Sequence, residues 1–336
     1  MSFDPSAAAS ADSGIFGLPF DRASSRIILL PVPFDATASY GGGTADGPSA
    51  ILKASHQVDL LDHRFGNIYE QGIFMLDIED SLRTLNAETR KLALPIIERG
   101  SPRKKDAKDL ERIELAGEHV RARTREHARQ ICAEGKIPGI VGGDHSTPLG
   151  QIESLAELHP GMGILQIDAH MDFRQAFEGF RYSHASIMWN VMQEAAEVSR
   201  IVQVGIRDTC IEEREYAATL GDRCRTYYDD DLADRLATGT PFLDIAREIV
   251  ESLPQNVYIS FDIDGLDPSL CVHTGTPVPG GLTFRELGVL LQVLRNSGKR
   301  IVGFDLVEVA TTKRDDFNAN VGARVLYRLC GVAAPR

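Results

Sequence analysis

Three short clusters of histidine and aspartate in this chain combine residue types that bind divalent cations. The clusters are Gly-Gly-Asp-His at 142–145, Asp-Ala-His-Met-Asp at 168–172 and Phe-Asp-Ile-Asp at 261–264. Together they offer imidazole and carboxylate ligands from His145, Asp168, His170, Asp172, Asp262 and Asp264. These mixed nitrogen and oxygen ligands are too many for one tetrahedral zinc ion, but they suit two cations that share carboxylates. The residue types therefore predict a binuclear metal centre of the kind that hydrolases use.

The spacing within the clusters also favours a common site. Successive side chains of a strand face opposite sides, so every second residue shares one face. Asp168, His170 and Asp172 follow this interval, and Asp262 and Asp264 repeat it. A single Asp-x-Asp pair is more often a helix cap or a charged loop than a pair of ligands. Because three clusters occur in this chain, each after an apolar run, we interpret them as ligands and not as helix caps or charged loops.

Apolar runs that alternate with helix-like segments predict an α/β fold with a mostly parallel sheet covered on both faces. Strands are expected near 26–33, 72–78, 137–141, 162–168, 200–206, 256–262 and 300–306. Helices are expected near 47–61, 106–134, 146–158, 241–253, 283–297 and 318–330, whereas the stretch 82–108 is ambiguous. Such sheets bind ligands at the carboxyl ends of their strands. All three clusters lie at such ends.

Composition and charge limit the classes of partner. Of the 336 residues, 43% are hydrophobic and 25% are charged, as in ordinary globular proteins. The net charge of −12 argues against nucleic acid or an anionic membrane as a partner. No segment has the apolar length of a membrane span, and residues 1–20 do not resemble a secretory signal.

Residues 1–14, rich in Ser and Ala, are predicted to form a flexible leader. Residues 15–336 are predicted to form a single catalytic domain, because no repeat or change of composition divides them. The cysteines are scattered, odd in number and without a Cys-x-x-Cys pair, which favours a reducing cytoplasm over disulfides or a zinc knot. They are Cys132, Cys210, Cys224, Cys271 and Cys330.

The clusters, read with their flanks, resemble the signatures of a known family. Gly142-Gly-Asp-His-Ser146, Asp168-Ala-His-Met-Asp172 and Ser260-Phe-Asp-Ile-Asp-Gly-Leu-Asp-Pro268 are similar to the motifs of the ureohydrolases, the arginase–agmatinase family. The resemblance begins near Pro33-Phe-Asp35 and extends to Val307-Glu308. It implies a three-layer α/β/α sandwich, commonly assembled as trimers or hexamers. It also implies two divalent cations per subunit, usually manganese and in some members nickel.

The resemblance divides the ligands between two cations, and the two groups of ligands overlap. One cation would be held by His145, Asp168, Asp172 and Asp262. The other would be held by His170, Asp168, Asp262 and Asp264. Asp144 is expected to support the ring of His145 from behind, because imidazoles that bind metals usually have such a partner.

Further residues resemble the family's catalytic pocket. His184, within Tyr182-Ser-His-Ala-Ser186, is similar to a proton-shuttling histidine. Glu308 resembles the carboxylate that receives a guanidinium group, and Thr276 resembles a threonine that lines the same pocket. Asp172 joins His184 and Glu308 as a predicted catalytic residue.

These residues make sense for the hydrolysis of a guanidinium group. That group is a poor electrophile, and water at neutral pH is a poor nucleophile. Two divalent cations can lower the pKa of water from about 15.7 towards about 7. Glu308 would pair with guanidinium N–H groups and orient the central carbon. His184 would protonate the departing amine, because the ordinary pKa of histidine lies near neutrality.

The chain departs from the arginases at positions that bind the amino-acid part of arginine. Arginases carry an Asn two residues after the second cluster, where this chain has Arg174. They also place an Asp two residues beyond an Arg-Asp pair, whereas Arg207-Asp208 is followed here by Thr209 and Cys210. Loss of partners for a charged group can change discrimination by about 10⁴. A substrate other than arginine is therefore expected.

Two readings of Arg174 remain open. It could bind the carboxylate of a guanidino acid or of formiminoglutamate, or it could form a structural ion pair with Glu178. The segment around it is aromatic, which would narrow the site for a small substrate such as guanidine or an alkylguanidine. The aromatic residues are Phe173, Phe177, Phe180, Tyr182 and Trp189.

The sequence thus predicts a cytoplasmic, homo-oligomeric amidinohydrolase that acts on a small guanidine or alkylguanidine, a guanidino acid or an agmatine-like compound. One rival is a formiminoglutamate hydrolase that releases formamide. Another is a non-catalytic metal-bound subunit of a partner, although intact His184 and Glu308 count against it. A zinc deacetylase on a related fold would hold one metal rather than two.

Overall fold

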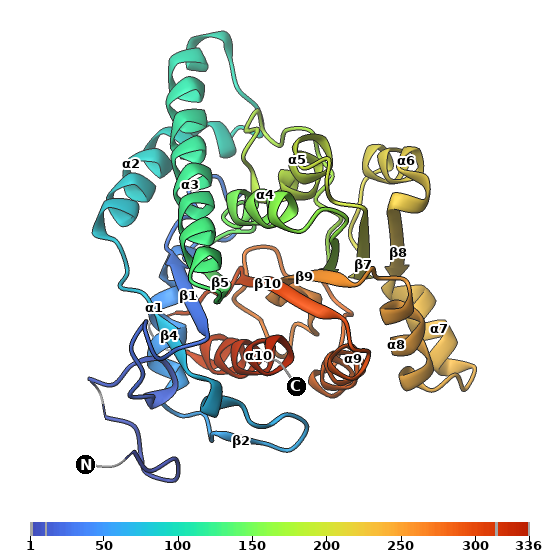
Figure 1. The fold of residues 1–336 in the computed structure, drawn as a ribbon. Coiled ribbons are helices and arrows are strands. Elements are labelled where there is room, and N and C mark those ends of the chain that lie inside the picture. Colours follow the sequence, from blue (N-terminus) through green and yellow to red (C-terminus); the bar gives the residue numbers. More distant parts are fainter. Residues whose placement is uncertain (1–2, 11, 313–314, 335–336) are drawn as a thin grey trace.

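The computed structural model describes residues 3–10, 12–312 and 315–334, and its centre is an eight-stranded sheet (Figure 1). The strand order is β4-β1-β5-β10-β9-β6-β7-β8, and all the strand pairs are parallel. The strands are β1 (Ile27–Val32), β4 (Ile73–Met75), β5 (Ile137–Gly142), β6 (Gly163–Ile167), β7 (Arg200–Ile206), β8 (Cys224–Tyr228), β9 (Asn256–Asp262) and β10 (Arg300–Val307). A small antiparallel pair, β2 (Leu61–Asp62) with β3 (Gly66–Asn67), stands apart from this sheet.

Helices cover both faces of the sheet and make three layers (Figure 1). One face carries α1 (Gly47–Ser55), α7 (Asp229–Ala237), α8 (Phe242–Glu251), α9 (Phe284–Asn296) and α10 (Phe317–Ala333). The other face carries α2 (Asp80–Ile97), α3 (Ala107–Ala133), α4 (Leu149–Leu158), α5 (Ile187–Glu194) and α6 (Ile211–Thr219). The predicted three-layer α/β/α sandwich is confirmed.

Burial on both faces explains why the central strands are apolar along their whole length. Every residue of β1 and β6 is buried, and in β9 only Asn256 is not. A strand that packs against helices on both sides cannot alternate apolar and polar residues. Short 3-10 turns join some of these elements: η1 (Ile15–Gly17), η2 (Thr44–Asp46), η3 (Ile68–Gln71), η4 (Lys104–Asp106), η5 (His184–Ser186), η6 (Gly221–Arg223) and η7 (Ile263–Gly265).

The seven predicted strands and six predicted helices all occur, and most lie within about three residues of their expected ends. The helix predicted over 47–61 is shorter, because α1 ends at Ser55 and Leu61 lies in β2. The ambiguous stretch 82–108 is mostly α2, which continues to Ile97 through Pro95. The edge strand β8 and the helices α5, α6 and α7 were not predicted from the sequence. Edge elements bury less surface, so their apolar pattern is weaker.

The predicted leader is only partly within the described residues, since 1–2 and 11 lie outside them. Its described residues are mostly exposed, although the ring of Phe3 lies 5.9 Å from that of Tyr69. The division into a leader and one domain stays a prediction. All five cysteines are free thiols.

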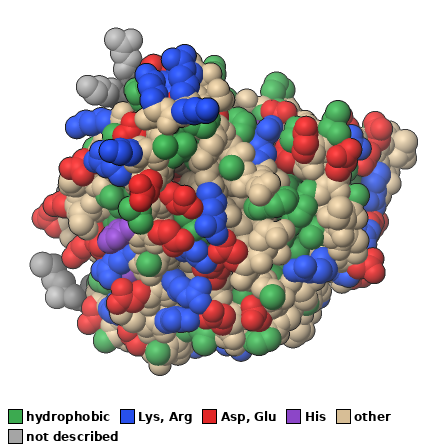
Figure 2. All heavy atoms as spheres, turned by 90° about the horizontal axis from the view of Figure 1, so that it is seen from above, with side chains coloured by type: hydrophobic (Ala, Val, Ile, Leu, Met, Phe, Trp, Pro, Cys, Tyr) green, Lys and Arg blue, Asp and Glu red, His purple; other side chains and the backbone are tan. Residues whose placement is uncertain are grey.

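The surface and the helices bear on possible partners. Figure 2 shows acidic and basic side chains intermixed on the face seen from above, with hydrophobic ones scattered among them. None of the described helices combines the length and apolar character needed to cross a membrane. The cytoplasmic location and the homo-oligomer stay predictions.

Candidate metal centre and active site

The predicted site residues follow four neighbouring strands at one edge of the sheet. The connection after β5 carries His145, the one after β6 carries 168–172, and Glu308 follows β10. Asp262 ends β9, and Asp264 lies in η7 directly after it. The strand order β5-β10-β9-β6 makes these ends adjacent. Parallel strands have their carboxyl ends at the same edge, so loops from distant parts of the sequence meet there.

The backbone of the second cluster is not the extended strand that its spacing suggested. Strand β6 ends at Ile167, and Asp172 has a positive φ of 57°. The amide of His170 donates to Asp168 Oδ1 at 2.7 Å, and the amide of Ala169 donates to Asp264 Oδ1 at 3.0 Å. The explanation by strand alternation is therefore wrong for 168–172. The side chains converge because the loop is bent and held by these bonds.

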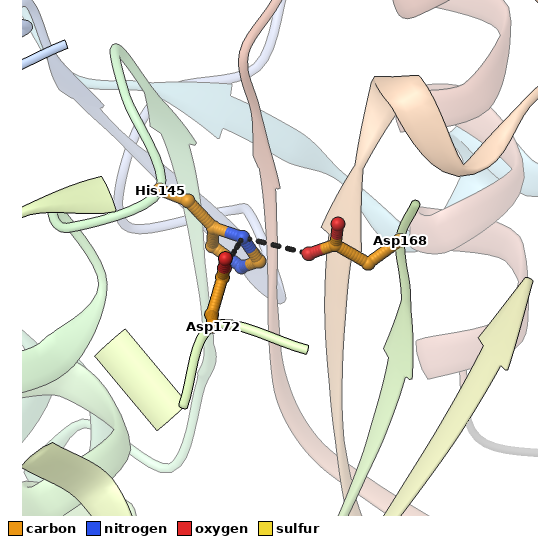
Figure 3. Close-up of side chains that lie close together, drawn as sticks. All are labelled: His145, Asp168 and Asp172. Atoms are coloured by element: carbon orange, nitrogen blue, oxygen red, sulfur yellow. Dashed lines mark ion pairs between the residues drawn. The ribbon is translucent and has the colours of Figure 1, made fainter. Parts of the chain in front are cut away.

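His145 faces three carboxylates through one ring nitrogen. Its Nδ1 lies 3.0 Å from Asp168 Oδ2, 2.9 Å from Asp172 Oδ2 and 3.4 Å from Asp262 Oδ2. Figure 3 shows the ring between Asp168 and Asp172. All four side chains are buried. The ligand atoms of His145, Asp168 and Asp172 lie within 4.8 Å of one another, which is close enough to hold one cation.

His170 forms a second cluster that shares Asp168 with the first. Its Nδ1 lies 3.1 Å from Asp264 Oδ2 and 3.6 Å from Asp168 Oδ1. Asp168 therefore turns one oxygen to His170 and the other to His145. A carboxylate with this arrangement can bridge two cations. The structure thus brings all six predicted ligands into two adjoining groups.

The ring of His145 is held from behind by Ser260, not by Asp144. His145 Nε2 lies 2.9 Å from Ser260 Oγ, whose hydroxyl donates to buried Asp305 at 3.2 Å. Since that hydroxyl donates to Asp305, it accepts from Nε2–H, which leaves the lone pair on Nδ1 facing the carboxylates. Asp144 Oδ1 instead accepts from Ser146, and its Oδ2 has no hydrogen-bond partner in the described part of the chain, so the prediction for Asp144 is wrong.

Electrostatics at the centre favour positive charge. Burial and the nearby charge of Asp168 raise the pKa of Asp172 to about 7. Burial and the charge of Asp264 raise the pKa of Asp262 well above its ordinary value. Burial opposes ionisation of Asp168 as well, but contacts with His145 and His170 hold its pKa below the ordinary range. Buried carboxylates in excess over imidazoles, with a lone pair aimed among them, fit divalent cations.

Glu308 and His184 lie beside the first cluster. Glu308 has a positive φ of 61°, and its Oε1 accepts from the His145 amide at 3.0 Å. His184 Nδ1 lies 3.4 Å from the same oxygen, and Ser39 Oγ contacts His184 Nε2 at 2.9 Å. Burial lowers the pKa of His184, but the carboxylate of Glu308 outweighs this effect and the net pKa is raised.

Glu308 lies close to a cavity whose wall includes its neighbours His145 and His184. Its Oε2 is buried and has no hydrogen-bond partner among the described residues. A Cβ at Gly275 would lie 2.7 Å from this oxygen, so glycine keeps the space open. The cavity has a volume of about 140 Å³ and is lined by Ser39, His145, His170, Asp172, Arg174, Phe177, His184, Ala185, Asp208, Glu213, Asp262 and Thr276. Predicted residues Thr276 and Arg174 are therefore part of its wall.

One of the two interpretations of Arg174 predicted an ion pair with Glu178, and the structure does not have this pair. Its guanidinium lies over the ring of Phe177 at 4.7 Å, and its Nε is 3.9 Å from buried Glu213. Phe177 is the one member of the predicted aromatic wall that lines the cavity. The others pack elsewhere: Phe173 and Tyr182 in the core, Phe180 against α2 and α3, and Trp189 on Tyr216.

Comparison with known proteins gives this arrangement a family. A sequence model of the arginase family matches residues 25–331. The chain is 30% identical to an N(1)-aminopropylagmatine ureohydrolase of Thermus thermophilus, with 94% of this chain and 92% of the relative covered. The chain belongs to the arginase family. It is also 28% identical to an agmatinase of Pyrococcus horikoshii, with 94% of each chain covered.

Solved structures agree with the fold of this arginase-family chain. Proclavaminate amidino hydrolase from Streptomyces clavuligerus superposes with a TM-score of 0.75 at 22% identity, covering 98% of this chain and 99% of that one. Agmatine ureohydrolase of Thermoplasma volcanium gives 0.71 at 22% identity, covering 98% and 94%. The family depends on two metal ions, and the paired His/Asp clusters fit that requirement.

Several residues of the site were missed by the sequence analysis. Ser260 carried a signal, because it lies two residues before Asp262 and so on the same face of β9. Asp305, Ser39 and Glu213 come from a strand, a connection and helix α6, respectively, and carried no local signal. Only the tertiary arrangement brings them to the cavity or to His145.

The support of His145 by Ser260 is testable. Ser260→Ala should weaken binding of the cation at the first cluster by about 10- to 100-fold, because the ring loses the partner that fixes its tautomer. Titration of metal-free protein with Mn²⁺, followed by calorimetry, measures this change. Ser154→Ala is the matched control, since Ser154 is equally buried and its hydroxyl has no hydrogen-bond partner among the residues that the structure describes. Equal affinities in the two variants would contradict the assigned role.

Proposed function

We propose that this protein is a binuclear metal-dependent hydrolase that cleaves a C–N bond of a guanidino compound, releasing urea and an amine or ammonia. The observation that carries the proposal is Glu308, whose buried Oε2 has no hydrogen-bond partner among the described residues and whose Oε1 accepts from the amide of His145 in the first cluster. A guanidinium is a planar cation with several N–H donors, which a carboxylate recognises by paired hydrogen bonds. Relatives named agmatinase and proclavaminate amidinohydrolase support the same reaction class.

The six ligands would hold two divalent cations, with Asp168 and Asp262 shared between them. Manganese is the proposed ion and nickel the alternative, because the set mixes imidazole with carboxylate. When bound, such a pair lowers the pKa of a water molecule to about 7 and stabilises negative charge that develops in the reaction. The buried carboxylates, whose pKa values are raised at Asp172 and Asp262, support this assignment.

The chain's own residues would orient the reactants. Glu308 would bind the guanidinium and turn its central carbon towards the clusters, and Thr276 would line the same pocket. Thr276 Oγ1 lies 3.4 Å from Asp264 Oδ2 and lines the cavity. Asp172 also lines the cavity and would orient the attacking water. Fixing both reactants in this way removes much of the entropic barrier to their encounter.

His184 would carry the proton that the leaving amine needs. Its raised pKa, caused by the carboxylate of Glu308, keeps the imidazolium form available near neutral pH. The contact between Ser39 and Nε2 fixes the ring, while Nδ1 faces Glu308. An amine is a poor leaving group until it is protonated, so this donor supports C–N cleavage.

Arg174 and the small cavity bear on the substrate. A permanent positive charge in the wall would disfavour a cationic tail such as that of agmatine, and it would favour a neutral or carboxylate-bearing one. We therefore favour guanidine, an alkylguanidine or a guanidino acid. The same arginine supports a second candidate, hydrolysis of formiminoglutamate to formamide. The carboxylate of Glu213 lies 3.9 Å from Arg174 Nε, so it would compete with a substrate carboxylate for this guanidinium.

A substrate panel tests the function directly. With both metals loaded, guanidine or guanidinobutyrate should release urea with a kcat/KM at least about 100-fold above that of arginine, since the groups that hold the amino-acid part are missing. Agmatine and formiminoglutamate complete the panel, with urea and formamide measured separately. Fast turnover of arginine would contradict the substrate class. Formamide release would establish the second candidate, and no turnover at all would favour a non-catalytic subunit.

Proton transfer and metal binding should separate in two variants. His184→Ala should keep both metals and lower kcat by about 10²- to 10⁴-fold, because the proton donor is lost. Asp168→Ala should lose both metals and all activity, because its two oxygens face different clusters. Elemental analysis and steady-state kinetics give both readouts. His273→Ala is the control, as His273 pairs with Asp315 outside the cavity. Metal loss in His184→Ala would make that residue a ligand instead.

Arg174 should contribute to binding only for substrates that carry a carboxylate. Arg174→Ala should raise KM for guanidinobutyrate by about 10- to 100-fold, the effect of losing a charged hydrogen bond, and leave guanidine unchanged. Arg214→Ala is the matched control, because exposed Arg214 stacks on Tyr228 away from the cavity. A uniform fall in kcat/KM across all substrates would identify Arg174 as a structural partner of Glu213.

A further inference from the structure

A larger cavity lies at the opposite edge of the sheet from the metal centre. Its volume is about 500 Å³, which is within the range of sites for small molecules. It is built around the amino ends of β1, β5 and β10, whereas the metal ligands follow the carboxyl ends of the central strands. Each strand is six to eight residues long, so about 20 Å separates the two sites.

The lining of this cavity is basic and contains no acidic side chain. Its titratable residues apart from Cys132 are Arg26, Lys136, His159, Arg295, Lys299 and Arg300. The whole chain has 48 acidic residues against 36 Lys and Arg, and the two signs are mixed over the face in Figure 2. A cavity wall of one sign on a protein of net charge −12 is therefore a departure from the rest of the chain.

Negatively charged helix ends and backbone carbonyls explain why some of these basic side chains lie here. The carboxyl ends of α3, α9 and α10 lie at the cavity, and each helix carries about half a negative charge there. Lys136 donates to the carbonyls of Arg22 and Ala23, and Lys299 donates to that of Leu253. Arg295 donates to the carbonyl of Gly331. Glu134 pairs with Lys136, so these cations have structural partners.

Arg26 and Arg300 are not explained in this way. Among the described residues, neither side chain has a hydrogen bond or an ion pair with an acidic group. The charge of Arg300 affects the pKa of two side chains in the cavity wall. Burial lowers the pKa of His159 and the charge of Arg300 lowers it further, while at Cys132 the same charge opposes the rise in pKa that burial causes.

The strand order sets the spacing of these two arginines. They stand at the amino ends of β1 and β10, the strands on either side of β5. Neighbouring strands are about 4.8 Å apart, so the two backbones are separated by about 10 Å. Two guanidinium groups at that spacing can each grip a separate anionic group by paired hydrogen bonds.

We propose that this cavity binds a small polyanion with at least two phosphate or carboxylate groups, held by Arg26 and Arg300 with Lys136 and Lys299 at its sides. The proposal does not depend on the function assigned to the metal centre. A ligand there should stabilise the fold by linkage. It should not compete with a substrate at the other edge of the sheet.

Binding to intact, metal-loaded protein tests the proposal. The probes are fructose 1,6-bisphosphate, benzene-1,3,5-tricarboxylate and inorganic phosphate, with excess Mn²⁺ and NaCl-matched ionic strength throughout. Calorimetry should give a Kd below about 1 mM for at least one multivalent probe and weaker binding of phosphate. The better of the two multivalent probes tells whether phosphate or carboxylate is preferred. No binding of either multivalent probe at 5-fold that concentration, about 5 mM, would overturn the proposal.

Variants locate the binding. Arg26→Gln and Arg300→Gln should each weaken binding by about 10- to 100-fold, as expected for loss of charged hydrogen bonds, whereas Arg214→Gln should bind as the parent does. Both positions are exposed, so folding and metal content should be unchanged. A second readout needs no variant: the probe should raise the pKa of His159, followed by proton NMR. Unaltered binding in the Arg26→Gln, Arg300→Gln double variant, or an unmoved His159, would contradict the site.

Discussion

Four aspartates share one buried space at the carboxyl edge of the sheet, and the rest of the site follows from the cost of that charge. Carboxylates removed from water and placed beside one another resist ionisation, as the raised pKa values of Asp172 and Asp262 express. Added positive charge stabilises the ionised form of these carboxylates. Two imidazoles supply part of it, and the remaining excess of negative charge fits divalent cations. Removing the cations would therefore affect both the chemistry and the local fold.

The polypeptide holds this centre with bent loops on a rigid frame. Asp172 and Glu308 both have positive φ, a conformation that costs about 1–3 kcal/mol for such residues. Hydrogen bonds from the surroundings hold it: the Trp189 amide donates to the Asp172 carbonyl, and the Glu308 amide donates to that of Gly143. Two of the four described non-glycine residues with positive φ therefore lie at the site, and the other two are Phe16 and Glu178. The parallel sheet supplies the frame, because its strand ends cannot move independently.

The His/Asp clusters and the cavity wall around Arg174 come from different parts of the molecule. The ligands of the clusters come from the ends of central strands, whereas Arg174, Phe177 and Glu213 come from a connecting loop and a helix start near the edge of the sheet. Loops tolerate change better than buried strands do. An unchanged metal centre can therefore serve different guanidino substrates, consistent with relatives that carry different substrate names. The opposite edge of the sheet has its own charged cavity, and its basic lining contrasts with the acidic centre.

The sequence by itself determined the α/β layers and the six candidate ligands, because both are local. Apolar runs and helical periodicity report burial within a few residues, and the three clusters sit directly after such runs. It did not determine the backbone of 168–172, the partner of Arg174 or the position of four of the five aromatic side chains. Nor did it reveal that Ser260 and Asp305 support His145, or that Ser39 contacts His184. These contacts join residues far apart in the chain, and only the packing of strands and loops decides which of them meet.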